Sequence, residues 1–251
     1  MNPDSTPKLL RMPPWSYTWI LLLPVLVLVA MFAQPWMKPS QLMADPVQWV
    51  QHRPELKDNS PPFFLGLVST TGGLIWWTGA VACLFAGVLM RSAGRLRSGA
   101  FLLSAGAFTG LLGLDDLLLI HDGYLAHFHV PDAVTLGCYG LFFVAHCAIF
   151  RREILASENG LLFLGMLLLG GSAGIDVLAP ETRYWGYTED SLKFLGLCAW
   201  AAYHCRLAYT ISMTVVGKGR PDQDAEAPDA LGIPAQLGSR LSRGFTDGQL
   251  K

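Results

Sequence analysis

Four ionisable residues stand close together in the otherwise apolar stretch LLGLDDLLLIHDGYLAHFH: Asp115, Asp116, His121 and Asp122. Asp176 stands alone in a second apolar stretch. Carboxylate oxygens and imidazole nitrogens, with no thiolate among them, are ligands that suit zinc, iron or manganese. We therefore expect these five residues to form a site for a divalent metal such as zinc or iron.

A second charged group, in YTEDSLKFLG, supplies residues for acid–base chemistry: Glu189, Asp190 and Lys193. On a helix, Lys193 can contact both carboxylates, because they precede it by four and three positions. We expect Glu189 or Asp190 to be the general base for a metal-bound water, and Lys193 to keep that base ionised. The alternative is structural, since buried ion pairs also dock membrane helices on one another.

The spacing of the first group matters for its geometry. Successive side chains on a straight helix are about 100° apart, so Asp115 and Asp122 share one line, and Asp116 and His121 lie to either side of it. Gathering all four requires a concave interior lined by several helices, or an unwinding of the helix near Gly123.

Apolar runs must position these residues. Charged residues make up only 15% of the 251 residues, compared with about 25% in soluble domains. A run of about 20 apolar residues crosses the hydrocarbon of a membrane. The sequence contains such runs at residues 17–34, 66–90, 100–121, 132–150, 160–179 and 191–212. We predict an all-α polytopic membrane protein with six transmembrane helices.

We divide the chain into a cytoplasmic N-terminus (1–16), a transmembrane domain (17–212) and a cytoplasmic tail (213–251). The tail is rich in Gly, Pro, Asp and Ser and lacks an apolar stripe, so we expect disorder there. The transmembrane domain includes a Pro-rich outer loop at 35–65. Its segment QLMADPVQWVQ is expected to lie on the outer surface and cap the acidic residues.

Lysine and arginine in short loops mark the cytoplasmic side of a membrane protein. The loops after the second and fourth runs contain such residues: Arg91, Arg95, Arg97, Arg151 and Arg152. Both termini should therefore be cytoplasmic, with the chain in the cell inner membrane. The third helix then runs outward, which places Asp115 roughly 9 Å below the outer boundary. We expect the site to face the periplasm.

Two further histidines, His146 and His204, stand at one depth on the fourth and sixth runs. Such a pair could be the axial ligands of a b-type haem. Buried, hydrogen-bonded histidines explain the pair better, and we expect no haem. A net charge of −1 without a basic stripe argues against nucleic acid as a partner. Membrane lipid and a hydrophobic small molecule are the expected partners, and the oligomeric state stays open.

At LDDLLLIHD and EDSLKFLG the sequence resembles a group of small bacterial and cyanobacterial integral membrane proteins of no assigned function. That group carries an Asp-Asp-x4-His-acid stretch and a later Glu-Asp-x2-Lys stretch. FLGLVSTTGGLIWW and RREIL extend the resemblance over about residues 63–210. The resemblance implies no known reaction, but it implies joint action of Asp115, Asp116, His121, Asp122, Glu189, Asp190 and Lys193.

A looser similarity is to the alkaline-ceramidase and progestin-receptor-like membrane hydrolases. In that superfamily, Ser, Asp and His on transmembrane helices bind zinc for amide hydrolysis. This chain departs from the pattern in two ways. It has six rather than seven predicted helices, and its last helix has only His204 where the superfamily has a His-x3-His pair.

The leading functional expectation is a metal-dependent hydrolase or oxidoreductase that acts on a lipid or another hydrophobic substrate. One alternative is a proton- or ion-coupled transporter, in which the carboxylates relay protons toward His146 and His204. The other is a non-enzymatic subunit or assembly factor of a membrane complex, for which the charges need only be structural.

Overall fold

The computed structural model describes residues 13–51, 61–125, 127–180 and 182–216. These residues form helices joined by turns, with no strand among them, which confirms the predicted all-α class. The helices are α1 (Pro14–Ala33), α2 (Pro39–Met43), α3 (Pro46–Gln51), α4 (Leu67–Ser92), α5 (Leu96–Leu118), the π-helix η4 (Ile120–Leu125), α6 (Asp132–Ile149), α7 (Arg151–Ala156), α8 (Gly160–Leu178) and α9 (Arg183–Val216).

Five of the described helices are long and apolar enough to cross a membrane: α1, α4, α5, α6 and α8. The chain is therefore a membrane protein. The sixth predicted span, residues 191–212, lies within α9, which is not among the five. His204, Arg206 and the charged residues near the start of α9 reduce its apolar character. A sixth crossing and the side on which the termini lie stay predictions.

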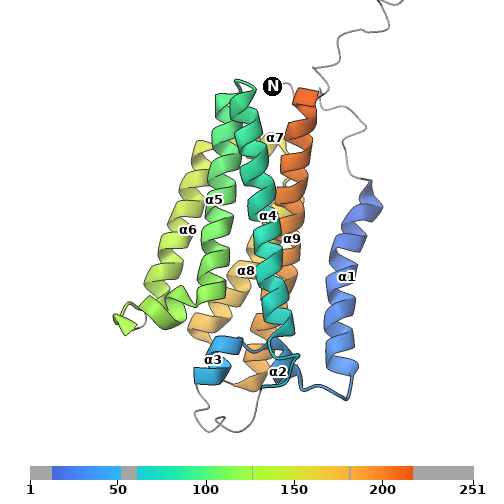
Figure 1. The fold of residues 1–251 in the computed structure, drawn as a ribbon, viewed down its shortest axis with the longest axis vertical. Coiled ribbons are helices and arrows are strands. Elements are labelled where there is room, and N and C mark those ends of the chain that lie inside the picture. The colour runs from blue at the N-terminus through green and yellow to red at the C-terminus, as the bar shows by residue number, and fades with distance from the viewer. Residues whose placement is uncertain (1–12, 52–60, 126, 181, 217–251) are drawn as a thin grey trace, which may run out of the picture. The chain divides into compact units, whose positions relative to one another are not determined.

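The helices α4 and α5 form an antiparallel hairpin (Figure 1). At Gly106 of α5, a Cβ atom would lie 2.9 Å from the carbonyl oxygen of Ala80 and 2.8 Å from the nitrogen of Leu84. No residue with a side chain fits at those distances, so glycine lets the two backbones meet. Close van der Waals packing over small residues associates membrane helices where water cannot drive them together.

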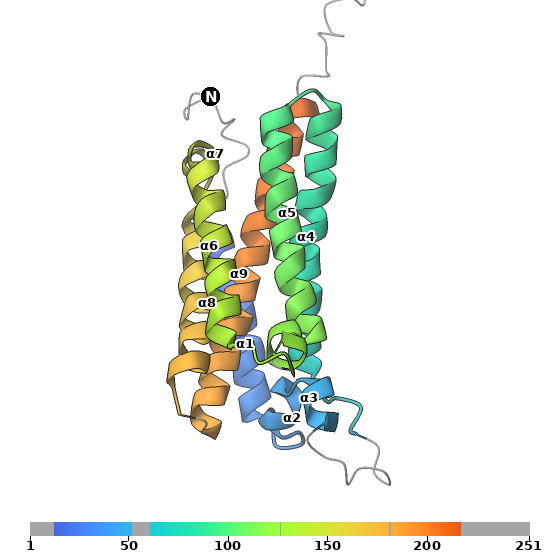
Figure 2. The same ribbon diagram turned by 90° about the vertical axis from the view of Figure 1, so that its left-hand side faces the viewer.

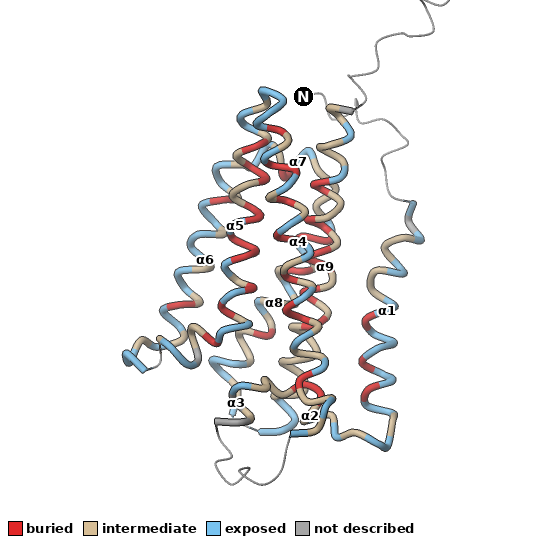
Figure 3. The backbone as a smooth tube through the Cα atoms, in the orientation of Figure 1, coloured by how far each residue is buried: buried red, intermediate tan, exposed pale blue. Residues whose placement is uncertain are grey.

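Helix α9 runs between the α4–α5 hairpin and the pair formed by α6 and α8 (Figure 2). A Cβ atom at Gly79 of α4 would lie 3.4 Å from the Cα atom of Ala201, and one at Gly165 of α8 would lie 3.1 Å from the nitrogen of Trp200. Buried residues gather on α4, α5 and α9 (Figure 3). Because protein flanks α9 on both sides, it can carry polar side chains that lipid would not tolerate.

Helix α1 contacts the rest of the bundle at two places. At one end, Leu28 and Met31 pack with Leu42, Met43 and Phe194 in a buried apolar cluster. At the other end, the Tyr17 hydroxyl donates a 3.2 Å hydrogen bond to Glu158, which also accepts from Arg206 at 2.6 Å. Much of the surface between these attachments is apolar and exposed, as expected for a helix that faces lipid.

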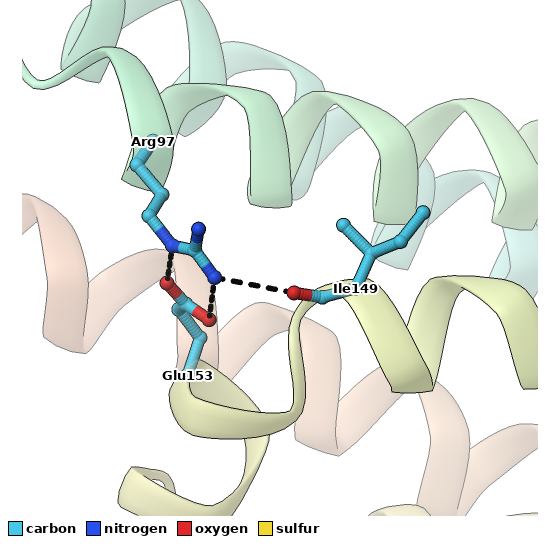
Figure 4. A network of polar contacts seen from close by, with 3 residues as sticks. All are labelled: Arg97, Ile149 and Glu153. Carbon is cyan, nitrogen blue, oxygen red and sulfur yellow. Dashed lines mark hydrogen bonds and ion pairs between the residues drawn. The ribbon is translucent and has the colours of Figure 1, made fainter.

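The junction of α6 and α7 is held by an arginine from α5 (Figure 4). The Arg97 guanidinium pairs with the Glu153 carboxylate and donates a 3.1 Å hydrogen bond to the carbonyl oxygen of Ile149. That carbonyl is at the C-terminal end of α6, where the helix itself supplies no donor. The hydrogen bond from Arg97 lowers the pKa of Glu153, which lies outside the apolar spans.

The loop and tail predictions are covered in part by the described residues. Within the Pro-rich loop 35–65, two short helices form, α2 and α3, each beginning at a proline that suits the first turn of a helix. The residues from Thr214 onward form a separate unit, of which only the end of α9 is described. The predicted disorder of the tail, and the N-terminal residues 1–12, lie outside the described residues.

Candidate functional site

The predicted metal ligands and acid–base residues come from the C-terminal ends of α5 and α8, the π-helix η4 and the first turns of α9, which lie at the same end of the bundle as α2 and α3 (Figure 1). Two chambers open there. The outer chamber, lined in part by Met43 of α2 and Asp45, has a volume of about 280 Å³. The inner chamber, lined in part by Tyr139 of α6 and by Trp76 of α4, has a volume of about 120 Å³. Both are lined by Asp116, Asp176, Glu189 and Lys193. The three helices therefore contribute to one continuous polar region.

An ion pair between Lys193 of α9 and Asp116 of α5 stands where the chambers meet. The sequence spacing suggested that Lys193 would serve Glu189 or Asp190 on its own helix. In the structure the lysine forms an ion pair with the Asp116 carboxylate across the helix interface. It also interacts electrostatically with Glu189 and Asp190, which line the outer chamber beside it. The side chain of Asp116 is 14% exposed, whereas that of Lys193 is 40% exposed, so water reaches the lysine more easily.

Helix α5 ends in a way that brings Asp115 and His121 together. Leu119 adopts the left-handed conformation, with φ = 50°, and the chain continues as the π-helix η4. The helix thus changes course four residues before Gly123, near which the sequence predicted unwinding. Asp115 accepts hydrogen bonds from the His121 backbone N–H at 2.9 Å and from Nδ1 of the imidazole at 2.7 Å.

The hydrogen bond between Asp115 and His121 determines which nitrogen of the imidazole ring carries the hydrogen. Asp115 is buried, and its carboxylate can only accept hydrogen bonds, so Nδ1 of His121 carries the hydrogen. In the neutral ring, Nε2 is then the basic nitrogen. Both residues line the inner chamber. A carboxylate that fixes the tautomer and orientation of a histidine is the arrangement used to prepare a general base.

Further polar groups that the sequence analysis did not single out line the inner chamber. Tyr139 of α6 lines it close to Asp115, and the buried Ser172 of α8 also lines it. The indole N–H of Trp76 of α4 is buried and has no acceptor among the described residues. The only sequence signal for these residues was a polar atom inside an apolar run, which is too common in membrane helices to be diagnostic.

One wall of the outer chamber is apolar. Val68, Phe194 and Leu197 form it, and Met43 of α2 closes it. Asp45, just before α3, adds another carboxylate. The segment predicted to cap the acidic residues therefore contributes to the chamber. A site with both carboxylate and hydrocarbon walls can contact the polar and the apolar parts of one molecule.

The proposed metal ligands are described except for the side chain of Asp122. In the part of the chain that the structure describes, no group of three or more His, Cys, Asp or Glu side chains is placed to hold a metal ion. Asp115 is hydrogen-bonded to His121, Asp116 is paired with Lys193, and Asp176 is exposed at the chamber wall. The side chain of Asp122 lies outside the described residues, so its predicted role is untested.

The deeper histidines, His146 and His204, line a third and much smaller cavity, of about 10 Å³. Most other residues of its wall are apolar or aromatic, including Phe101, Phe143 and Trp200. A volume of this size corresponds to about one water molecule and is far smaller than a haem macrocycle.

Comparison with known proteins gives one result. The model of a family described as a domain of unknown function matches residues 19–207, most of the chain. No curated protein and no solved structure matches the chain significantly. The family match agrees with the resemblance to a group of uncharacterised membrane proteins, and no comparison connects the chain with alkaline ceramidases.

Proposed function

Because the chain belongs to DUF8692, a family described only as a domain of unknown function, its activity is inferred from its own site, and we propose that it is a membrane-embedded hydrolase acting on an amphiphilic substrate. The observation that carries the proposal is the hydrogen-bonded Asp115–His121 pair on the wall of the inner chamber. A volume of about 120 Å³ holds several water molecules beside it.

The proposed reaction uses the pair as a general base. His121 Nε2 takes a proton from water while the water oxygen bonds to the carbonyl carbon of the substrate. The same imidazolium then gives the proton to the leaving oxygen or nitrogen as its bond to that carbon breaks. Asp115 stabilises the positive charge on the ring during the reaction. Lys193, which lines the inner chamber, supplies a positive charge for the oxyanion.

The apolar surroundings support a substrate with a hydrocarbon part. The outer chamber has the apolar wall of Val68, Phe194 and Leu197. An open apolar groove of about 440 Å³ runs along α1, lined by Val25, Leu28, Val29, Phe32, Ala33 and Leu195. One buried cluster contains Leu28 of the groove and Phe194 of the outer chamber, so the apolar walls of the two spaces pack on each other. A lipid-like molecule would therefore place its polar end in the chambers and its chain along α1.

The proposed orientation keeps the site on the periplasmic side of the inner membrane. The chambers are at the ends of α5 and α8, whereas the arginines of the α4–α5 loop and of α7 are at the opposite end of the same helices. Arginine-rich short loops stay in the cytoplasm. The proposal therefore includes a substrate that approaches from the outer leaflet.

A second candidate function is proton-coupled transport. The specific observation behind it is that ionisable residues of α5, α8 and α9 line two adjoining chambers with the Lys193–Asp116 pair where they meet. Intramembrane ionisable residues commonly form proton relays. In this reading Asp116 releases Lys193 when it takes a proton, and Glu189 and Asp190 deliver that proton from the outer chamber.

The test compares purified wild-type protein with Asp115→Asn and His121→Gln, each in vesicles of defined phospholipid composition. We expect fatty acid release by the wild type, detected by mass spectrometry, and a loss of about 100-fold or more in both variants. Asp132→Asn is the matched control, because this acidic residue in the first turn of α6 lines neither chamber.

Other outcomes separate the alternatives. Proton flux without product release, abolished in Asp116→Asn, contradicts the hydrolase and supports the transporter. A third outcome is one metal ion per wild-type protein, with the metal lost in both Asp116→Asn and His121→Ala. That result would mean that a metal, rather than His121, activates the water. Copurifying subunits with neither activity would support the assembly factor.

A further inference from the structure

Apolar side chains are exposed where the chain passes from α5 to α6. They lie in the last turn of α5, in η4, in the turn after η4 and at the start of α6: Leu117, Leu118, Tyr124, Phe128 and Val134. We call these residues the rim patch. Tyr124 is 65% exposed and Phe128 is 60% exposed, and their rings meet edge to face with centroids 5.3 Å apart. The rim patch therefore leaves aliphatic and aromatic surface uncovered by the described residues.

The rim patch lies where two membrane spans end. Helices α5 and α6, of 23 and 18 residues, are both long and apolar enough to cross a membrane. At 1.5 Å per residue, α6 alone extends over about 27 Å, close to the thickness of the hydrocarbon layer. The connection between the two helices is therefore at the boundary between the hydrocarbon and the lipid head groups.

The connection also points toward the lipid that surrounds the bundle. Figure 1 shows the chain between α5 and α6 projecting sideways, across the direction of the helices. On α5, the exposed residues Leu111 and Leu114 precede Leu118 at helical spacing, so they continue the rim patch along one face of the span. On α6, Leu141 is 71% exposed. The rim patch is thus continuous with the lipid-facing surface of both helices.

The backbone of the connection makes its own hydrogen bonds. The Tyr124 N–H donates to the carbonyl oxygen of Leu119 at 3.2 Å. The carbonyl oxygen of Leu125 accepts from the N–H groups of Phe128 and Val130 at 3.0 and 3.1 Å. A loop in water can leave such groups to the solvent, whereas a backbone near hydrocarbon must satisfy them within the protein. These bonds suit a position where water is scarce.

We propose that the rim patch is inserted into the membrane surface, with Tyr124 and Phe128 at the boundary between head groups and acyl chains. Tyrosine is enriched at this boundary because its ring is apolar and its hydroxyl is polar. The partner is lipid rather than a second copy of the chain, because the rim patch continues the lipid-facing surface of α5 and α6.

This anchor has a consequence for the candidate site. The π-helix η4 carries His121 three positions before Tyr124, and His121 lines the inner chamber. A membrane surface that holds Tyr124 therefore also holds His121 near the depth of the head groups. The anchor itself does not depend on the hydrolase proposal, because it needs no reaction at His121.

The experiment is fluorine NMR of full-length protein in phospholipid nanodiscs, with trifluoromethyl-phenylalanine replacing Phe128. Dissolved oxygen concentrates in lipid, whereas a gadolinium chelate stays in water, so the ratio of the relaxation caused by the two reports depth. The same label replaces Leu141, in the middle of α6, as the lipid control. It replaces the exposed Ser92, at the end of α4, as the water control.

We expect the oxygen-to-gadolinium ratio at position 128 to fall between those of the two controls. A ratio equal to that at Ser92 overturns the proposal, because Phe128 would then be in water. Protection from both agents also overturns it, because a second copy of the chain would then cover the rim patch. A ratio equal to that at Leu141 contradicts the boundary position.

A variant tests whether the two rings act together. In protein labelled at position 128, Tyr124→Ser should move the ratio toward that of the Ser92 control, because the ring that packs on Phe128 is lost. The matched control is Tyr209→Ser, an exposed tyrosine of α9 outside the rim patch, which should leave the ratio unchanged. An equal ratio with and without Tyr124 contradicts a shared anchor. If Tyr124→Ser does not fold, the label in otherwise unchanged protein decides the proposal.

Discussion

Asp116 and Lys193 connect two helices by charge at the point where the outer and inner chambers meet. Because Lys193 is partly exposed, water screens the pair, and its contribution is smaller than that of a fully buried pair. Removing one partner leaves the other charge in a region of low polarity. Loss of either residue should therefore affect stability and the shape of both chambers.

A double-mutant cycle measures this interaction. We expect Asp116→Asn and Lys193→Met each to lower the free energy of unfolding in detergent micelles. The double variant should lose less than the sum, by about 1 kcal/mol. The control cycle combines Lys193→Met with Arg151→Met, a residue of α7 at the opposite end of the bundle, and should be additive. Additivity in the first cycle would mean that the ion pair adds nothing.

Asp115 both terminates helix α5 and forms part of the candidate site. Its carboxylate accepts the backbone N–H of His121 just beyond the last turn of α5, and its backbone carbonyl accepts from Leu119. The second bond is the last regular bond of the helix, whereas the first takes the place of the bond that the His121 N–H would make to a backbone carbonyl in a continuing α-helix. The same turn places the His121 ring against the carboxylate, so the helix end and the candidate general base have one cause.

At the scale of elements, the α5–α7 contact predicts a pH dependence of stability. The hydrogen bond from Arg97 holds the pKa of Glu153 below its ordinary value of 4.5. A carboxyl whose folded pKa is lowered stabilises the fold above its unfolded pKa, and that stabilisation disappears as the pH falls through the folded pKa.

We therefore expect wild-type protein to melt at a higher temperature than Glu153→Gln at neutral pH. The difference should shrink toward zero as the pH falls below 4.5. Circular dichroism melts in detergent micelles measure it. Arg97→Met should lose the same pH-dependent part, since it removes the other partner. A difference between wild type and Glu153→Gln that is constant across this range would contradict the assigned role of the pair.

On the scale of the whole molecule, the carboxylates of the chambers and the arginines of the short loops lie at opposite ends of the same helices. The chambers with Asp116, Asp176 and Glu189 lie at one end, and Arg97 and Arg151 are at the other. Lipid-facing surfaces between these ends are apolar. The distribution of charged residues between the two ends of the bundle, rather than any single helix, therefore predicts the orientation of the protein in the membrane.

Fusions to alkaline phosphatase, which is active only outside the cytoplasm, test this orientation. We expect low activity for fusions after Gly94 and Ser157, which follow α4 and α7, and high activity after His129 and Thr182. A fusion after Met213 should be inactive if α9 crosses the membrane as the sixth span. The reverse pattern, or activity after Met213, would contradict the predicted topology.

The sequence alone determined the helical class, the apolar helices and the set of charged residues that gather at one end. These follow from run length and composition, because hydrocarbon accepts only backbone that is hydrogen-bonded within its own segment. It also determined the small residues that let α4 and α5 pack closely. Gly106 is an example, because any side chain at that position would clash with the backbone of α4.

Only the tertiary structure decided which charges pair. Spacing along α9 favoured Lys193 with Glu189 or Asp190 and did not reveal Asp116 of α5, with which Lys193 forms an ion pair because the helix interface brings that carboxylate to the lysine. Lys193 also interacts electrostatically with Glu189 and Asp190 on its own helix. The left-handed turn at Leu119 likewise joins Asp115 to His121, which a straight helix would hold apart. Partner choice depends on how helices are rotated and where they end, and a one-dimensional periodicity does not encode either.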